Sequence, residues 1–191
     1  TIRKGSLYFV STEGNDLSGD GSFQKPWKSL DDVNNNGALE KIKPGDILYI
    51  KGKFFHDQIT GDRACIDIGD PGTALAPKAI IAYPGAEVTI GNKDIPRTFS
   101  LWVSGIGLSS HWIISKLKLI AKHEAVSLFH NFRVMGNHIS APLGDGPTGA
   151  VTGLGNDLYF MGNELTQIGY SGTSKLYHPI YFQSHEACSG P

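Results

Sequence analysis

Four segments of this chain place ionisable side chains directly before a short apolar stretch, at residues 101–103, 125–129, about 148–154 and 180–183. A base that removes the proton next to a carboxylate, with a cation that stabilises the resulting charge, performs β-elimination on a uronate sugar. Glycoside hydrolysis instead needs two carboxylates that face each other at a defined separation. The side chains in question belong to Lys93, Asp94 and Arg97, to Lys122, His123 and Glu124, to Asp145, and to Lys175, Tyr177 and His178.

These residues also have plainer interpretations. Loops collect charged side chains, so a solvated rim explains much of the row. His178 lies in an apolar setting before Pro179, which also suits a buried, hydrogen-bonded histidine. His123 and His130 flank one apolar stretch at a spacing that fits no metal motif. Because the row contains no Asp-Asp or Asp-x-Asp cluster, it favours a lyase or epimerase over a hydrolase.

A repeated segment predicts the scaffold that would position this row. Residues 132–139 (FRVMGNHI) and 158–165 (LYFMGNEL) align without a gap, 26 residues apart, and share Met-Gly-Asn. A fainter copy at 112–119 lies 20 residues earlier and lacks the Gly-Asn pair. A strand, a tight turn and a second strand that recur at this spacing are typical of one coil of a β-solenoid. Residues of successive coils then stack side by side on one face.

Composition agrees with an all-β protein of the secreted, cell-surface or periplasmic type. Glycine accounts for 24 of the 191 residues, and only 18% are charged. The net charge of −1 gives no electrostatic case for nucleic acid or a membrane surface, and no apolar run approaches the roughly 18 residues that span a bilayer. Cys65 lies in an alternating strand at 64–68 and is predicted to be a buried free thiol, far in sequence from Cys188.

The chain is predicted to divide at residue 45. Residues 1–45 read as a strand, a turn-rich loop and a capping helix, and residues 46–191 as the coils. Ser29 is the expected N-cap of the helix, Leu30, Leu39 and Ile42 supply an interrupted apolar stripe, and Pro44 ends it. The run Asn-Asn-Asn-Gly at 34–37 weakens its middle, so two short pieces are an alternative.

Four segments, together with the Gly-Asn repeats and residues 177–182 (YHPIYF), resemble the pectate-lyase-like right-handed parallel β-helix superfamily. The segments are YFVSTEGND at 8–16, KPWKSL at 25–30, KPGDILYI at 43–50 and PKAIIAYPG at 77–85. The resemblance implies three parallel sheets per coil, with residues 132–135 and 158–161 on the second sheet. It also implies that Asn137 and Asn163 stack as an internal ladder at the turn that follows. Asparagine suits that place because it tolerates left-handed dihedrals and its amide both donates and accepts.

The same resemblance places the substrate cleft along the first sheet, over the loops that precede its strands. A row that mixes arginine, lysine and histidine along this cleft suits the carboxylates of an acidic polysaccharide, and the lack of a carboxylate pair favours a lyase as the activity. Lys175, His178 or Lys122 would be the base, Tyr177 the acid for the leaving oxygen, and Arg97 the neutralising cation. The expected sugar-contacting residues are Arg97, Lys122, His123, Glu124, Asp145 and Tyr181. A non-catalytic glycan-binding protein, a tailspike-like fibre or adhesin, and a glycoside hydrolase remain alternatives.

Two further expectations concern calcium and the C-terminal end. Calcium is a possible helper in related lyases, and Asn15, Asp16, Asp20 and Ser22 form the densest group of oxygen ligands. Such a loop also forms turns by capping its own backbone, which is the favoured interpretation, and no metal ligand is assigned. The sequence stops just after a strand, so the last coil is expected to be covered by another chain or by further residues of a longer protein.

Overall fold

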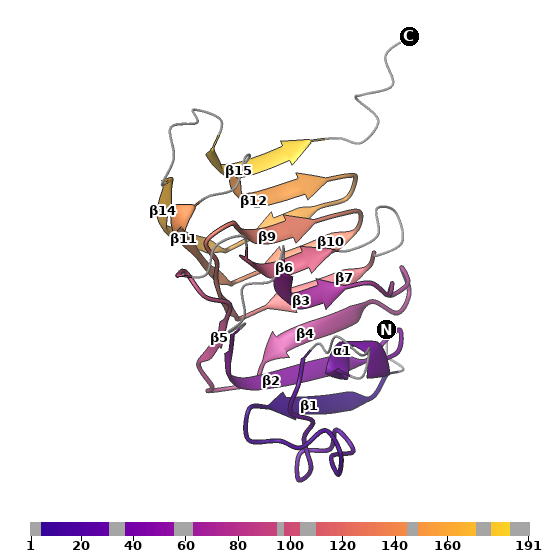
Figure 1. The fold of residues 1–191 in the computed structure, drawn as a ribbon. Helices are drawn as coiled ribbons and strands as arrows, with labels where there is room; N and C mark the ends of the chain where they lie inside the picture. The colour runs from indigo at the N-terminus through magenta and orange to yellow at the C-terminus, as the bar shows by residue number, and fades with distance from the viewer. Residues whose placement is uncertain are drawn as a thin grey trace.

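The computed structural model describes residues 5–30, 37–55, 63–94, 98–103, 110–144, 149–170 and 177–183. Within these ranges, the side chains of residues 63, 98–103, 143 and 170 are not described. The chain rises from the N-terminal end to the C-terminal end as a stack of parallel strands (Figure 1). The strands fall into three stacks, here called sheets A, B and C.

Each sheet takes one strand from each successive coil, and all of the pairs are parallel. Sheet A contains β1 (Leu7–Ser11), β2 (Ile47–Phe54), β4 (Lys78–Ala82), β7 (Trp112–Ser115), β10 (Phe132–Met135) and β13 (Tyr159–Met161). Sheet B contains the end of β2, then β5 (Val88–Ile90), β8 (Lys118–Ile120), β11 (His138–Gly144) and β14 (Glu164–Tyr170). Sheet C contains β3 (Arg63–Ile68), β6 (Thr98–Val103), β9 (Glu124–Leu128), β12 (Gly149–Leu154) and β15 (His178–Gln183).

The order A, B, C repeats along the chain, as in β10, β11 and β12 followed by β13, β14 and β15. In Figure 1 the strands of sheet C lie in front and run to the right, and those of sheet A lie behind and run to the left. Because the chain climbs as it turns in this direction, the coil is right-handed. The predicted right-handed parallel β-helix is therefore confirmed. The sheet-C strands match the four stretches that the sequence assigned to the first sheet, with β3 as a fifth member.

Alternating apolar side chains fill the interior. One inward column of sheet A consists of Leu48, Ile80, Ile114 and Val134, which pair in register and are each 0% exposed. Cys65 is a buried free thiol, as predicted, with its sulfur 3.8 Å from the carbonyl oxygen of Phe54. Cys188 lies outside the described residues.

Asn137 and Asn163 form the predicted ladder at the turn between sheets A and B. The Asn137 amide Nδ2 donates to the Ile114 carbonyl of the preceding coil at 3.1 Å and to Asn163 Oδ1 at 3.0 Å. Its Oδ1 accepts the Leu117 N–H at 3.0 Å, and Asn163 Nδ2 donates to the Val134 carbonyl at 2.8 Å. The amides thus tie three coils together, and only 2% of the surface of Asn137 is exposed.

The backbone reason given for asparagine at this turn is wrong. The left-handed residue is the one before it: Gly136 has φ of 63°, Gly162 has φ of 60°, and Lys116 has φ of 65° in the fainter copy. Glycine adopts this conformation without a steric penalty, whereas lysine does not. Asparagine is therefore explained by its hydrogen bonds alone.

The structure describes the last part of the predicted N-terminal helix. Helix α1 (Ala38–Lys41) begins after Gly37, which makes no side-chain cap. Ser29 is not its N-cap, because the Ser29 hydroxyl donates to Asp16 Oδ2 at 2.7 Å. Residues 31–36 lie outside the described ranges, so the rest of the predicted helix is not tested.

The short helix still closes the N-terminal end of the core. Ala38 and Leu39 are buried in the same cluster as Trp27 and Ile42, and Figure 1 shows α1 in the lower, N-terminal part of the stack. Lys41 also places its Nζ 5.1 Å from the centre of the Trp27 ring. Among the described residues no helix is long and apolar enough to cross a membrane.

Lys78 is a buried cation near the same end, with 2% of its surface exposed. Burial lowers its pKa, while the charges of Asp70, Asp46 and Glu40 act in the opposite direction. Its Nζ lies 5.2 Å from the centre of the Trp112 ring, a cation–π contact that partly replaces lost hydration.

At the other end of the stack, β15 is exposed on both faces. Ile180 continues the inward column of Val126 and Val151, yet it is 42% exposed, and Phe182 is 43% exposed. What covers this end stays a prediction.

Candidate functional site

The outer face of sheet C carries a polar column. Asp67, Ser127, Thr152 and Tyr181 occupy corresponding positions on β3, β9, β12 and β15, and buried apolar residues flank the first three of them. Trp102 holds the same position on β6, with its side chain not described. Adjacent strands lie about 4.8 Å apart, so these side chains form one continuous row across the sheet.

Two side-chain hydrogen bonds link this column to the amino end of β9. Thr152 donates its hydroxyl to Glu124 Oε2 at 2.8 Å and lies 3.4 Å from the Ser127 hydroxyl. Glu124 is only 8% exposed, so this bond holds its carboxylate in a fixed place beside the polar column. The sequence predicted Glu124 as a sugar-contacting residue, and the structure places it next to the outer face of the predicted sheet.

Tyr177 reaches across from the loop before β15 to the loop before β9. Its hydroxyl donates to the carbonyl oxygen of His123 at 3.4 Å. The ring lies against Gly144, where an added Cβ would come within 2.3 Å of the Tyr177 hydroxyl. Only glycine leaves room for this ring, so the approach of Tyr177 to His123 depends on the residue at 144.

His178 stacks on Tyr181 on the same strand, with ring centres 5.9 Å apart and 17° between the planes. His178 is exposed on the last described strand, at the end of the stack whose cover stays a prediction, so the alternative of a buried structural histidine is not tested. Tyr181 pairs with Thr152 on the neighbouring strand. The structure therefore brings His123, Glu124, Tyr177, His178 and Tyr181 into one cluster, which we call the sheet-C cluster and which includes Thr152.

The remaining predicted residues are only partly placed. Lys122 is half-buried and directly precedes His123 in the same loop. Arg97, Asp145 and Lys175 lie outside the described residues, and their roles stay predictions. None of the described contacts therefore tests the idea of a row of cations.

Asp67 is the residue of this face that sequence reasoning missed. Its side chain projects from the outer face of sheet C, and its Oδ1 atom is buried with no hydrogen-bond partner among the described residues. A buried unpaired carboxylate oxygen is costly. The signal was present in the strand Ala-Cys-Ile-Asp-Ile, where aspartate takes the one outward position between two inward isoleucines.

The Gly-Asn-Asp loop uses its oxygens for turns. Asn15 Oδ1 accepts the N–H groups of Leu17 and Ser18 at 2.8 and 3.0 Å, and Asp20 Oδ1 accepts the N–H of Ser22 at 2.9 Å. Asp16 Oδ1 accepts the N–H groups of residues 28 and 29 at 2.7 and 3.0 Å. The interpretation as a turn is confirmed by these bonds. No group of three or more His, Cys, Asp or Glu side chains converges within the described ranges.

Replacing Asp16 by alanine should destabilise the protein in a pH-dependent way. Burial alone would raise the pKa of Asp16, but hydrogen bonds from Ser29 and Lys28 together lower it below 3.8. The stabilisation is therefore complete above pH 3.8 and is lost as the pH falls through the lower pKa of the folded state. Urea unfolding should show a loss of about 1–2 kcal/mol at neutral pH that shrinks in acid. Asp20→Ala, which removes bonds only to the hydroxyl and the N–H of Ser22 within one exposed turn, is the control with a smaller effect. An Asp16→Ala loss independent of pH would contradict this account.

No family model matches the sequence, and no curated protein matches it. Two solved structures resemble the fold. Pectate lyase Pel9A has a TM-score of 0.48 at 15% identity, covering 84% of this chain and 46% of that chain. GH136 lacto-N-biosidase from Eubacterium ramulus has a TM-score of 0.44 at 16% identity, covering 95% of this chain and 36% of that chain. The chain spans less than half the length of either structure, so its function has to be inferred from its own residues.

Proposed function

We propose that the protein binds an acidic polysaccharide along the outer face of sheet C and cleaves it by β-elimination. The observation that carries the proposal is the sheet-C cluster. Residues more than 50 positions apart in sequence, such as His123 and Tyr177, come into contact at the amino ends of β9 and β15, the two strands on either side of β12. An exposed imidazole, two phenols, a fixed carboxylate and a hydroxyl then share one face, as a sugar-processing site requires.

His178 is the proposed base. Its exposed ring is held by the stack on Tyr181, so a bound uronate can approach it. It removes the proton next to the sugar carboxylate, the electron pair forms a carbon–carbon double bond, and the bond to the leaving oxygen breaks. Lys122, with Lys175 and Arg97 from outside the described ranges, is assigned to the substrate carboxylate, whose negative charge grows during the step. Lys175 is the alternative base.

Tyr177 is the proposed proton donor to the leaving oxygen. Its present bond to the His123 carbonyl is 3.4 Å long, beyond the usual range for a hydroxyl donor. A bond this weak is readily exchanged for one to a sugar oxygen. Gly144 leaves room for the phenol end of Tyr177, including its hydroxyl, and so holds the ring in this position.

A hydrolase that uses Glu124 and Asp67 fits the geometry less well. Asp67 lies two strands away from Ser127, and Glu124 lies three residues before Ser127. Strand spacings of about 4.8 Å and rises of about 3.3 Å per residue put the two backbone positions about 14 Å apart. Catalytic carboxyl groups of glycosidases lie about 5–9.5 Å apart, and Glu124 is bonded to β12, on the side away from β3.

The test is to incubate the protein with polygalacturonate, alginate and a glycosaminoglycan, with neutral dextran as the control polymer. β-Elimination leaves an unsaturated sugar, so absorbance near the ultraviolet edge should rise with at least one acidic polymer and not with dextran. New reducing ends without that absorbance would instead indicate hydrolysis. Binding without any cleavage would favour the non-catalytic alternative and would contradict the proposed activity.

A further inference from the structure

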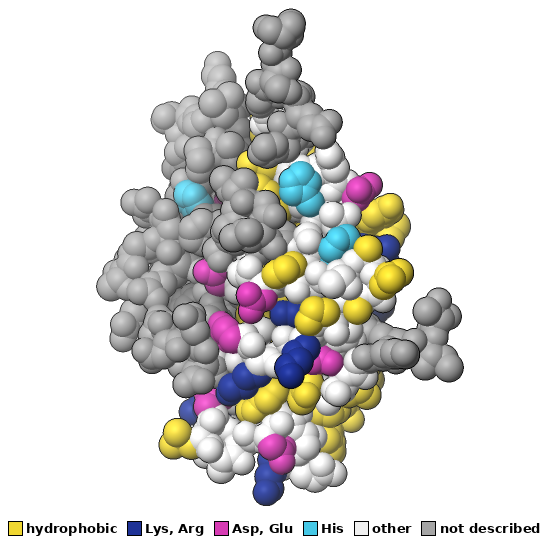
Figure 2. Space-filling view, turned by 90° about the vertical axis from the view of Figure 1, so that its right-hand side faces the viewer, with side chains coloured by type: hydrophobic (Ala, Val, Ile, Leu, Met, Phe, Trp, Pro, Cys, Tyr) yellow, Lys and Arg dark blue, Asp and Glu magenta, His cyan; other side chains and the backbone are white. Residues whose placement is uncertain are grey.

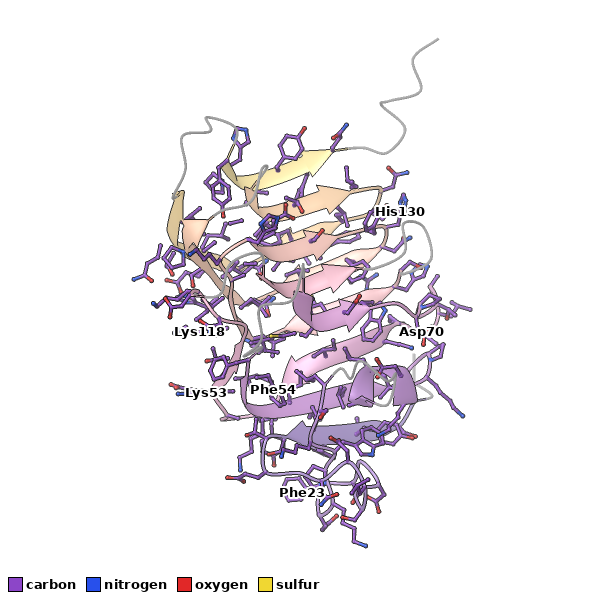
Figure 3. All side chains as sticks on the ribbon, in the orientation of Figure 1. Phe23, Lys53, Phe54, Asp70, Lys118 and His130 are labelled. Carbon is purple, nitrogen blue, oxygen red and sulfur yellow. The ribbon has the colours of Figure 1, made fainter. Side chains whose placement is uncertain are left out.

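A polar cavity lies away from the sheet-C cluster, at the corner of the coil where the chain leaves sheet C and enters sheet A. It has a volume of about 300 Å³ and is lined by the start of β7, β10 and β13, with Ala74 and Pro77 as one wall. Figure 3 marks this side of the molecule by Asp70 and His130, opposite Lys53 and Lys118 on sheet B. Figure 2 looks onto it and shows acidic, basic and histidine side chains interspersed with apolar ones.

One side of the cavity is a column of three polar residues. His111, Asn131 and Asp157 each directly precede a coil's sheet-A segment, at positions that correspond in the register of β7, β10 and β13. They follow one another at the strand spacing of about 4.8 Å. All three line the cavity.

The same three residues have left-handed backbones, with φ of 59°, 62° and 56°. At the next corner of the same coils the left-handed position is held by Gly136 and Gly162 in two coils out of three. Glycine would relieve the strain at either corner. Histidine, asparagine and aspartate are the non-glycine residues that adopt this conformation most readily, and three successive coils here use them in place of glycine. All three line the cavity, and this shared position points to a use for their side chains there.

The floor of the cavity combines a cation with an aromatic ring. Arg133 Cζ lies 5.6 Å from the centre of the Tyr159 ring, and Tyr159 is 46% exposed. Trp112 supports the floor from inside: it is 1% exposed, and its indole N–H donates to the Asp70 carbonyl at 2.8 Å. The cavity is therefore a preformed hollow that an arriving ligand fills without rearranging the core.

We propose that this cavity binds one neutral pyranose ring. Its volume is at the lower end of the range for small-ligand sites, which suits a single six-membered ring. The amide of Asn131, the carboxylate of Asp157 and the guanidinium of Arg133 offer paired donors and acceptors to neighbouring hydroxyl groups. The opposite charges of Arg133 and Asp157 leave no net attraction for a charged sugar. The site lies on a different face from the sheet-C cluster and does not depend on the proposed lyase activity.

The test uses methyl pyranosides of glucose, galactose and mannose, with glucuronate and glucosamine as charged rings of the same size. We expect at least one neutral pyranoside to shift the backbone amide NMR signals around His111, Asn131 and Asp157. Glucuronate and glucosamine should bind at least about tenfold more weakly. The inference is overturned if no neutral pyranoside shifts these signals, or if a charged sugar binds more tightly.

Glycine substitutions separate binding from folding. Asn131→Gly and Asp157→Gly remove the side chains and relieve the left-handed strain, so the Tm should stay the same or rise while affinity falls about tenfold or more. Lys116→Gly is the matched control, because Lys116 is also left-handed, with φ of 65°, and does not line the cavity. It should raise the Tm and leave sugar binding unchanged. Unchanged affinity in both cavity variants would overturn the inference.

Discussion

Replacing Asn137 by alanine is expected to cost about 2–4 kcal/mol of unfolding free energy. The substitution leaves the Leu117 N–H and the Ile114 carbonyl without their partners in a position that is 2% exposed. An unpaired buried polar group costs about 1–3 kcal/mol, and two are created at once. Urea denaturation followed by circular dichroism should show a lower midpoint with an unchanged slope, provided that unfolding is two-state.

Asn163→Ala is the graded comparison for this prediction. Asn163 donates to the Val134 carbonyl, and its Oδ1 accepts the backbone N–H and the Nδ2 of Asn137. Asn163 is partly exposed, however, so water can replace its amide in these bonds. The loss should therefore be clearly smaller than for Asn137. A loss below about 0.5 kcal/mol for Asn137→Ala would show that the ladder does not hold the coils together. Equal losses would show that water does not replace the amide of Asn163.

The sequence predicted the coils because the strand pattern is local. The Met-Gly-Asn repeat recurs with its apolar neighbours in the same places, and parallel stacking of like positions follows directly from such a repeat. The role of Ser29 was less predictable, since a serine hydroxyl can cap a helix or bind a distant side chain. In the structure the Ser29 hydroxyl donates to Asp16, 13 residues earlier, and no helix-capping pattern in the sequence reveals this tertiary contact.

The site was predictable only in part, for a different reason. The sequence placed Tyr177 and His123 before strands of one sheet, but their contact depends on Gly144, which comes from a third segment. Asp67 was missed because an aspartate between two isoleucines reads first as a strand position and not as a functional group. The left-handed column of His111, Asn131 and Asp157 could not be predicted from the sequence. The φ angle of a non-glycine residue depends on its position in the coil, which its residue type alone does not reveal.

His178→Gln should reduce turnover on the cleaved polymer by about 100-fold to 10,000-fold, the usual contribution of a general base. The exposed ring makes one described contact with another ring, the stack on Tyr181, so unfolding free energy should fall by less than about 1 kcal/mol. Tyr177→Phe is the companion variant. It keeps the ring against Gly144 and removes only the hydroxyl, so turnover should fall while the Tm changes little.

A matched histidine variant and a second proposed base separate this chemical role from a structural one. His138→Gln makes the same chemical change on sheet B, where His138 contacts Thr166 and Glu164, and should leave turnover unaffected. If His178→Gln keeps full activity while Lys175→Ala abolishes it, the base is Lys175 and His178 only shapes the surface. If both variants keep full activity, Lys122 is the remaining proposed base, and full activity of Lys122→Ala as well would show that elimination at the sheet-C cluster is wrong.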